Sequence, residues 1–153
     1  MPSLEHKIPP PVIGLLVGVS MYGLAMVTTP IELAPWLRYA IAASLAGIGM
    51  SFDVLGLLAF RRARTTVNPL RPERASALVT DGVYRLTRNP MYVGMAFFLL
   101  AWATLLASPL SALGIPFFVA YISRFQIAPE ERVLRARFGD DFERYTARVR
   151  RWL

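Results

Sequence analysis

Polar side chains that could bind an anion collect at the start of an apolar segment. The stretch YRLTRNPMYVG, residues 84–94, carries Arg85 and Arg88 shortly before an Asn-Pro step. Asn89 is a residue type that commonly caps helix N-termini, and Pro90 suits the first helical position. We therefore predict a helix that begins at Pro90, whose free N–H groups and positive dipole end could bind a carboxylate or a phosphate.

Two adjacent carboxylates follow the next apolar segment. Glu130 and Glu131 would point about 100° apart on a helix, so each needs a partner of its own. One carboxylate could bind an arginine and the other the ammonium group of a ligand. The alternative is that both only stabilise a helix N-terminus. The neighbouring residues Arg132, Arg135 and Arg137 are compatible with that alternative.

We expect apolar helices to hold these polar groups in place. Of the 153 residues 55% are hydrophobic, the mean hydropathy is +0.44 and the formal net charge is +7. The apolar residues form blocks of about twenty with almost no charges, a pattern typical of membrane-spanning helices. We predict an all-α polytopic membrane protein, one domain over residues 1–153, with spans at 12–29, 36–60, 91–107 and 110–123.

The third and fourth predicted spans form a helical hairpin, because only Ser108 and Pro109 join them. Pro116 would interrupt the fourth span, which we expect to lean on the other helices. Arginines are concentrated in the loop 61–90 and in the segment after Ser123, and the loop between the first two spans has few charges. The positive-inside rule therefore places both termini and the predicted site on the cytoplasmic side.

Residues 129–153 are predicted to form two short helices at the cytoplasmic membrane interface. Pro129 would open the first helix and Gly139 would end it, and Asp140 with Glu143 resembles a capping box for the second. Apolar residues recur at helical spacing in the second helix, which gives it one apolar face: Phe142, Tyr145, Val149 and Trp152.

The residue types that are missing restrict the chemistry. The chain has no cysteine and one histidine, His6, which excludes disulfides, thiolate metal sites, a cysteine nucleophile and a histidine metal cluster. Reactive groups must then come from arginine, acidic residues, tyrosine, asparagine or a cofactor. Asp53 lies within the second predicted span, where an unpaired carboxylate is unfavourable. It either pairs with a loop arginine or helps to form a pocket.

The order and spacing of these residues resemble the isoprenylcysteine carboxyl methyltransferase and phospholipid methyltransferase group of integral membrane enzymes. The family pattern is Gly-x-Tyr, then Arg-His-Pro-x-Tyr-x-Gly at a helix start, a hairpin of two spans, and a Glu-Glu pair followed by Leu, Phe-Gly, Tyr and Val-x-Arg. The matching residues in this chain are Gly82, Tyr84, 88–94, Glu130, Glu131, Leu134, Phe138, Gly139, Tyr145 and 149–151.

This resemblance implies S-adenosylmethionine as methyl donor, bound between the start of the third span and the C-terminal helices. The donor's carboxylate needs an arginine or free N–H groups, its ammonium a carboxylate, and its adenine an apolar or aromatic wall. The residues implied at the cofactor are Tyr84, Arg88, Asn89, Pro90, Tyr92, Gly94, Glu130, Glu131 and Phe138. As catalytic residues we predict Glu131 and Arg135.

The chain departs from the family pattern at two positions. Asn89 replaces the usual histidine, so no proton-transfer role can pass to this position, although its amide can still contact a cofactor. Gln126 stands four residues before Glu130, where family members often carry a basic residue, and Arg124 precedes it by two.

Two other functions fit the residues. An NADPH-dependent membrane reductase would use the arginines to bind nucleotide phosphate, and a non-enzymatic adaptor would use them to bind anionic lipid headgroups. For a methyltransferase, the acceptor would be a lipophilic molecule that enters from the bilayer. A prenylated cysteine carboxylate, a phospholipid amine, a small thiol and an isoprenoid-like lipid all remain open. We expect no nucleic-acid partner.

Overall fold

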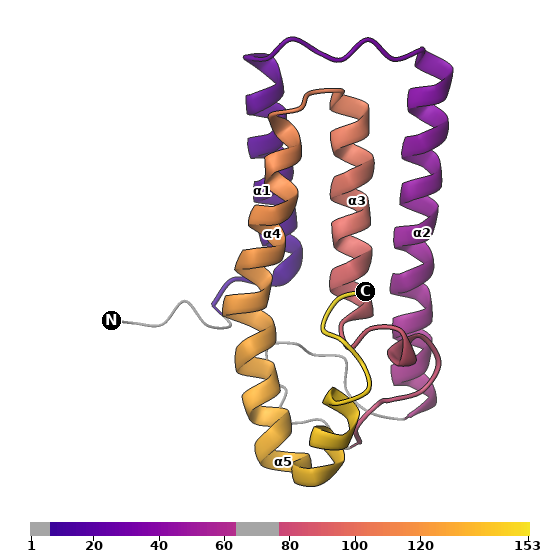
Figure 1. Ribbon diagram of the computed structural model, residues 1–153, viewed down its shortest axis with the longest axis vertical. Helices are drawn as coiled ribbons and strands as arrows, with labels where there is room; N and C mark the ends of the chain where they lie inside the picture. Colours follow the sequence, from indigo (N-terminus) through magenta and orange to yellow (C-terminus); the bar gives the residue numbers. More distant parts are fainter. Residues whose placement is uncertain (1–6, 64–76) are drawn as a thin grey trace.

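The computed structural model describes residues 7–63 and 77–153, and within these ranges it contains helices and no strand. Four helices run roughly side by side along the long axis of the molecule (Figure 1). These are α1 (Pro10–Met26), α2 (Pro35–Arg62), α3 (Pro90–Leu106) and α4 (Gly114–Ile122), which continues through η4 (Ser123–Ile127) into α5 (Ala128–Thr146). The short elements are η2 (Gly82–Arg85) and η3 (Ser111–Leu113). The all-α prediction is thus confirmed for the described residues.

A helix occupies each of the four ranges predicted as spans. Two helical runs are long and apolar enough to cross a membrane, Pro35–Arg62 and Ser111–Thr146, and two shorter apolar helices accompany them, Pro10–Met26 and Pro90–Leu106. Large apolar side chains remain exposed on the outer faces of α1 and α2, for example Leu16 at 54% and Leu55 at 51%. Because a soluble protein rarely exposes so much contiguous apolar surface, these faces indicate a membrane protein.

The tip of the predicted hairpin is held by hydrogen bonds. Ala107 adopts the left-handed conformation (φ 50°) that ends α3, and Ser111 donates from its hydroxyl to the Ser108 carbonyl at 2.7 Å. The Ser108 hydroxyl also lies 2.5 Å from that of Thr28, just after α1. The connection between α3 and α4 is therefore short and joined to the end of α1.

The fourth helix is longer than the sequence predicts. We expected a span that ended at residue 123, interrupted by Pro116, and a new helix from 129. Instead, Pro116 lies in the first turn of α4, where a missing N–H breaks no helical hydrogen bond, so it interrupts nothing. In η4 the Ala128 N–H donates to the Ser123 carbonyl five residues back, and this wider turn allows the chain to continue through Pro129.

The bend at Gly139 is where the sequence predicts it. Gly139 has φ 48° and ψ −122°, which divides α5 into two helical parts, and glycine adopts this conformation at little cost. The predicted capping box is not among the described contacts, and the Glu143 carboxylate accepts from Arg135. The helix ends at Thr146, so the last two residues of the predicted apolar face, Val149 and Trp152, lie beyond it.

Glycines let α2 and α3 approach closely where Gly49 and Gly56 face the first half of α3. A Cβ atom built on Gly49 would lie 2.8 Å from the carbonyl oxygen of Gly94, and one built on Gly94 would lie 2.9 Å from that of Gly49. Both distances are too short for a real side chain. Small residues of this kind allow the close backbone packing that joins helices in membranes.

We predict that Gly94→Ala destabilises the protein by about 1–3 kcal/mol, because the added methyl group overpacks the contact with α2. Thermal unfolding in detergent micelles measures the change. The matched control is Gly47→Ala on the same helix pair, where a Cβ meets nothing within 4 Å. That substitution should leave stability unchanged or raise it, since alanine favours helix. Equal effects of the two variants would contradict close packing at Gly94.

Candidate functional site

The start of α3 lies beside the start of α5, and two predicted residues meet between them. The Tyr92 hydroxyl donates to Glu130 Oε1 at 2.6 Å, and the tyrosine is only 6% exposed. Tyr92 packs in the apolar cluster that also contains Ile122 and Ile127, from α4 and η4. Among the described residues, the Glu130 carboxyl is held at the edge of an apolar environment by this one hydrogen bond from the tyrosine.

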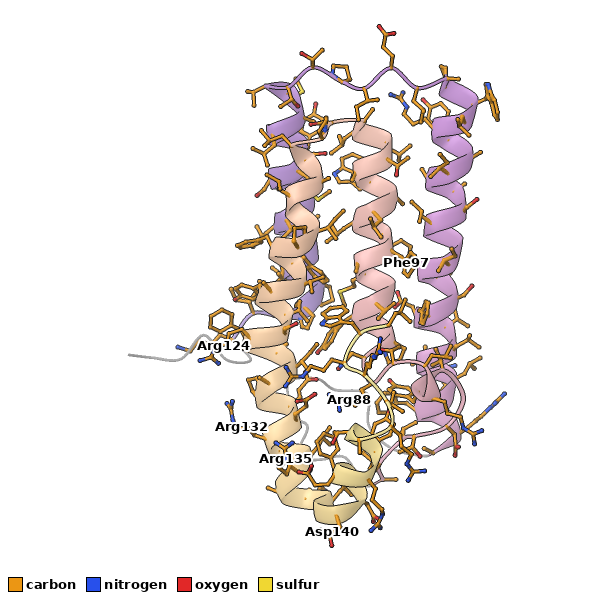
Figure 2. All side chains as sticks on the ribbon, in the orientation of Figure 1. Arg88, Phe97, Arg124, Arg132, Arg135 and Asp140 are labelled. Atoms are coloured by element: carbon orange, nitrogen blue, oxygen red, sulfur yellow. The ribbon has the colours of Figure 1, made fainter. Side chains whose placement is uncertain are left out.

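The second glutamate is bound by two arginines. Glu131 is 8% exposed; its Oε1 accepts from Arg88 Nη2 at 2.9 Å and its Oε2 from Arg151 Nη2 at 2.6 Å. Arg151 Nε donates to Oε1 as well, also at 2.9 Å. We call these three residues the Glu131 cluster. It joins three segments distant in sequence: the residues before α3, the first turn of α5 and the C-terminus. Figure 2 shows Arg88 pointing inward, whereas Arg132 extends outward from α5.

The C-terminal segment, residues 147–153, also binds the backbone before α3. The Arg88 N–H donates to the Arg150 carbonyl at 2.9 Å. The Arg151 carbonyl accepts from the Thr87 hydroxyl at 2.9 Å and from the Asn89 amide at 3.0 Å. Asn89 does occupy the N-cap position, but its side chain makes no cap hydrogen bond. The predicted N-cap position of Asn89 is thus confirmed, but its amide binds the C-terminal segment instead of the helix N-terminus.

Burial sets the protonation of Glu130, which lies outside the predicted spans. Loss of solvent raises the pKa of this carboxyl from 4.5 to about 8, the hydrogen bond from Tyr92 opposes the rise, and the nearby charge of Glu131 adds to it. Near neutral pH the group is mostly protonated. A cation placed beside it would favour the charged form, so the carboxyl suits a positively charged ligand.

Two buried polar atoms near these residues have no hydrogen-bond partner in the described part of the chain. They are Nε of Arg88 and Oε1 of Gln126. The other end of the Gln126 amide donates to the Ile8 carbonyl at 2.8 Å, which fixes the orientation of the side chain. Gln126 precedes Glu130 by about one turn of the same helical run. A free N–H donor and two acceptors, Gln126 and Glu130, match a ligand that carries both a carboxylate and cationic groups.

The remaining predicted residues make no described hydrogen bond to this group, although the charge of Glu130 adds to the effect of burial on Tyr84 and raises its pKa. Tyr84 and Phe138 belong to a second apolar cluster with Phe142 and Tyr145, and the Tyr145 hydroxyl donates to the Tyr84 carbonyl at 2.7 Å. Burial raises the pKa of Tyr84, which therefore stays protonated. Gly94 faces α2 rather than α5.

Arg135 is exposed and pairs with Glu143. The fold thus brings six of the predicted site residues together at the start of α3 and of α5: Arg88, Asn89, Pro90, Tyr92, Glu130 and Glu131. The other predicted residues lie outside this group.

From the sequence we assigned no site role to Arg151 or Thr87. Arg151 was visible as the last residue of the Val-x-Arg pattern, but only the fold brings it to Glu131. A chemical argument could have suggested this second partner. A nearly buried carboxylate is favourable only with strong partners, and a single arginine leaves half of the carboxylate's acceptor capacity unused.

Comparisons with known proteins point to one family. The family model described as phospholipid methyltransferase matches residues 37–141. Protein-S-isoprenylcysteine O-methyltransferase B of Arabidopsis thaliana is 29% identical over 115 residues, which are 69% of this chain and 57% of that protein. A probable protein-S-isoprenylcysteine O-methyltransferase of Oryza sativa subsp. indica is 31% identical over 117 residues, 74% of this chain and 60% of the rice protein.

A shorter relative is an uncharacterized protein of Haemophilus influenzae. It is 46% identical over 63 residues, which are 41% of this chain and 100% of that protein. The chain spans somewhat under two thirds of the length of the two plant relatives.

The raised pKa of Glu130 predicts that stability depends on pH. Between about pH 4.5 and 8 the folded chain holds a proton that the unfolded chain has lost, so the free energy of unfolding falls as pH rises. Denaturant titrations in micelles at several pH values measure this slope. Glu130→Gln should flatten it, and Glu143→Gln, at an exposed carboxylate, should not. An unchanged slope in Glu130→Gln would contradict the assignment.

Proposed function

Because the chain belongs to the phospholipid methyltransferase family, we propose that it transfers a methyl group from S-adenosylmethionine to a lipophilic acceptor. The observation that carries the proposal is the position of the Glu130 carboxyl, bound by Tyr92 and next to the Glu131 cluster at the start of α3. The names of the plant relatives, which are O-methyltransferases of S-isoprenylcysteine, support methyl transfer as the reaction.

The polar atoms of the site suit the charges of the proposed donor. Glu130 and Oε1 of Gln126 can accept hydrogen bonds from its ammonium and lie where a sulfonium charge would be stabilised. Nε of Arg88 can donate to its carboxylate. Asn89 and Pro90 would contact it through the start of α3. The ring of Tyr92 and, from the neighbouring cluster, those of Tyr84 and Phe138 are proposed as the wall for adenine.

Methyl transfer from a sulfonium depends more on alignment of the two reactants than on a strong base. S-adenosylmethionine, when bound, supplies a methyl group that its sulfonium has already activated, so positioning and exclusion of water are the main demands on the protein. The Glu131 cluster fixes the start of α3 against α5. Both oxygens of Glu131 already accept from arginines, which favours a positioning role over the catalytic role that we predicted from sequence. The catalytic role of Arg135 stays a prediction, and its pair with Glu143 lies on the surface.

We propose that this site faces the cytoplasm. The start of α3, the end of α2 and all of α5 lie at one end of the molecule, opposite the α1–α2 connection (Figure 1). That end carries most of the arginines, among them Arg61, Arg62 and those of the C-terminal segment, and the connection at the other end is nearly uncharged. Arginines at this boundary would also bind anionic lipid headgroups, while the acceptor enters from the bilayer.

Calorimetry of S-adenosylmethionine binding to the purified chain in micelles tests the proposal. We expect saturable binding that weakens at least about tenfold in Glu130→Gln, because a hydrogen bond to a charged group contributes about 1.5–3 kcal/mol. Arg88→Ala should weaken binding as well. Arg85→Ala, at an exposed arginine paired with Asp81, is the matched control and should bind like the unmodified chain.

Two results would contradict the proposal. Binding of NADPH instead of S-adenosylmethionine would favour a reductase. Binding of neither by a folded sample would favour an adaptor for anionic lipid. Thermal midpoints of each variant separate loss of the site from loss of the fold.

A further inference from the structure

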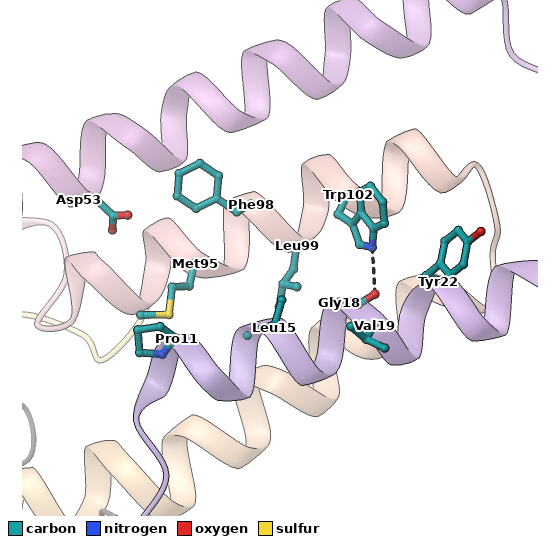
Figure 3. A pocket seen from close by; sticks show the side chains of 11 residues that line it. Pro11, Leu15, Gly18, Val19, Tyr22, Asp53, Met95, Phe98, Leu99 and Trp102 are labelled. Carbon is teal, nitrogen blue, oxygen red and sulfur yellow. Dashed lines mark hydrogen bonds between the residues drawn. The ribbon is translucent and has the colours of Figure 1, made fainter.

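A buried N–H group of Arg88 has no hydrogen-bond partner among the described residues. The atom is Nε, and three other buried side-chain atoms share this property: Nε of Arg38, Oδ1 of Asp53 and Oε1 of Gln126. Asp53 packs against the backbone of Gly94 and lines an apolar groove of about 690 Å³ (Figure 3), and the described lining of that groove contains no residue of the Glu131 cluster. The sequence left a loop arginine or a pocket for Asp53, and the described contacts place it at this pocket. An unpartnered buried N–H group is costly, so Arg88 needs an explanation of its own.

The other two nitrogens of the Arg88 guanidinium are engaged. Nη1 donates to the Thr146 carbonyl at 3.3 Å, and Nη2 donates to Glu131 Oε1 at 2.9 Å. Nε and Nη2 share one edge of a guanidinium, and through such an edge an arginine can make two parallel hydrogen bonds to a carboxylate. Arg88 therefore contacts Glu131 through one nitrogen of this edge, while the other nitrogen has no described partner.

Arg151 accounts for the incomplete contact of Arg88. It uses the same edge fully, because its Nε donates to Glu131 Oε1 at 2.9 Å and its Nη2 to Oε2 at 2.6 Å. A carboxylate can take one such side-on arginine, since the parallel pair occupies the lone pairs that both oxygens direct to that side. Arg88 is thereby restricted to a single bond, and its Nε remains a buried donor that a ligand can use.

The backbone of the C-terminal segment is held independently of the Arg151 side chain. The Arg150 and Arg151 carbonyls accept hydrogen bonds from the residues before α3. The Trp152 indole N–H donates to the Ser123 hydroxyl at 3.0 Å. These bonds do not involve the Arg151 guanidinium. Replacing that group should therefore change the pairing of Glu131 and leave the segment in place.

We propose that Arg151 is a positioning residue for the methyl donor: by pairing side-on with Glu131, it keeps Nε of Arg88 free to bind the donor's carboxylate. This step rests on the proposed function. Without the Arg151 guanidinium, Arg88 would turn both Nε and Nη2 onto Glu131, and the donor's carboxylate would lose its hydrogen bond. Arg151 acts through Glu131 and Arg88 and does not have to touch the donor.

Binding of two ligands to the purified full chain in micelles tests this inference. The ligands are S-adenosylmethionine and its decarboxylated form, which keeps the adenosyl group, the sulfonium and the amine. Equilibrium dialysis with radiolabelled ligands also measures weak affinities. The main variant is Arg151→Lys, which keeps the positive charge beside Glu131 but cannot supply two parallel N–H groups. We expect it to weaken S-adenosylmethionine about tenfold, as for the loss of one hydrogen bond to a charged group, and the decarboxylated form less than about twofold.

Two further variants support the test. Arg148→Lys is the matched control, because Arg148 is exposed in the same segment and its Nε donates to the Arg144 carbonyl. It should bind both ligands like the unmodified chain. Arg151→Ala frees Glu131 for Arg88 and should show the same selective loss as Arg151→Lys, so it replaces that variant if the thermal midpoint of Arg151→Lys shows that it does not fold.

Three results would overturn the role of Arg151. Unchanged binding of S-adenosylmethionine in Arg151→Lys would mean that positive charge alone suffices. Equal weakening of both ligands would indicate a general disturbance of the site. Equal affinity of the unmodified chain for the two ligands would mean that the carboxylate is not bound. Failure of the unmodified chain to bind S-adenosylmethionine would instead reject the proposed function, and this inference with it.

Discussion

The buried carboxylate of Glu131 is the constraint on which the candidate site depends. A charge so little exposed is stable only with strong partners, and the chain supplies Arg88 from before α3 and Arg151 from its C-terminal segment. These partners come from both sides of the α3–α4 hairpin. Satisfying one carboxylate therefore fixes the start of α3, the first turn of α5 and the C-terminal segment relative to each other. The contact of Tyr92 with Glu130 follows from that arrangement.

Two neighbouring glutamates thereby acquire different chemistry. Glu131 is held by Arg88 and Arg151, which favours a positioning role. Glu130 faces Tyr92 and apolar surroundings, and the raised pKa of its carboxyl leaves it ready to receive a cation. Divergent environments for adjacent titratable groups are a recurrent way to divide structural and ligand-binding roles.

Local features of the sequence predicted the helices well and their side-chain contacts poorly. The start at Pro90 and the bend at Gly139 were predictable, because proline and glycine restrict the backbone regardless of tertiary context. The continuous run from α4 into α5 was not, since the wide turn before Pro129 leaves no simple signature. The amide of Asn89 binds Arg151 rather than its own helix because the C-terminal segment reaches it, a contact between residues 62 positions apart. For the same reason the pairing of Glu131 could not be read from spacing.

We propose that the start of α3 and the residues from Gln126 to Glu131 form one binding site for S-adenosylmethionine. Ultraviolet crosslinking of radiolabelled S-adenosylmethionine to the purified chain, followed by peptide mapping, tests it most directly. We expect the label to fall within residues 88–94 or 126–131, and excess unlabelled donor to abolish it. Label on α1 or α2, with the α3 and α5 peptides unmodified, would contradict it.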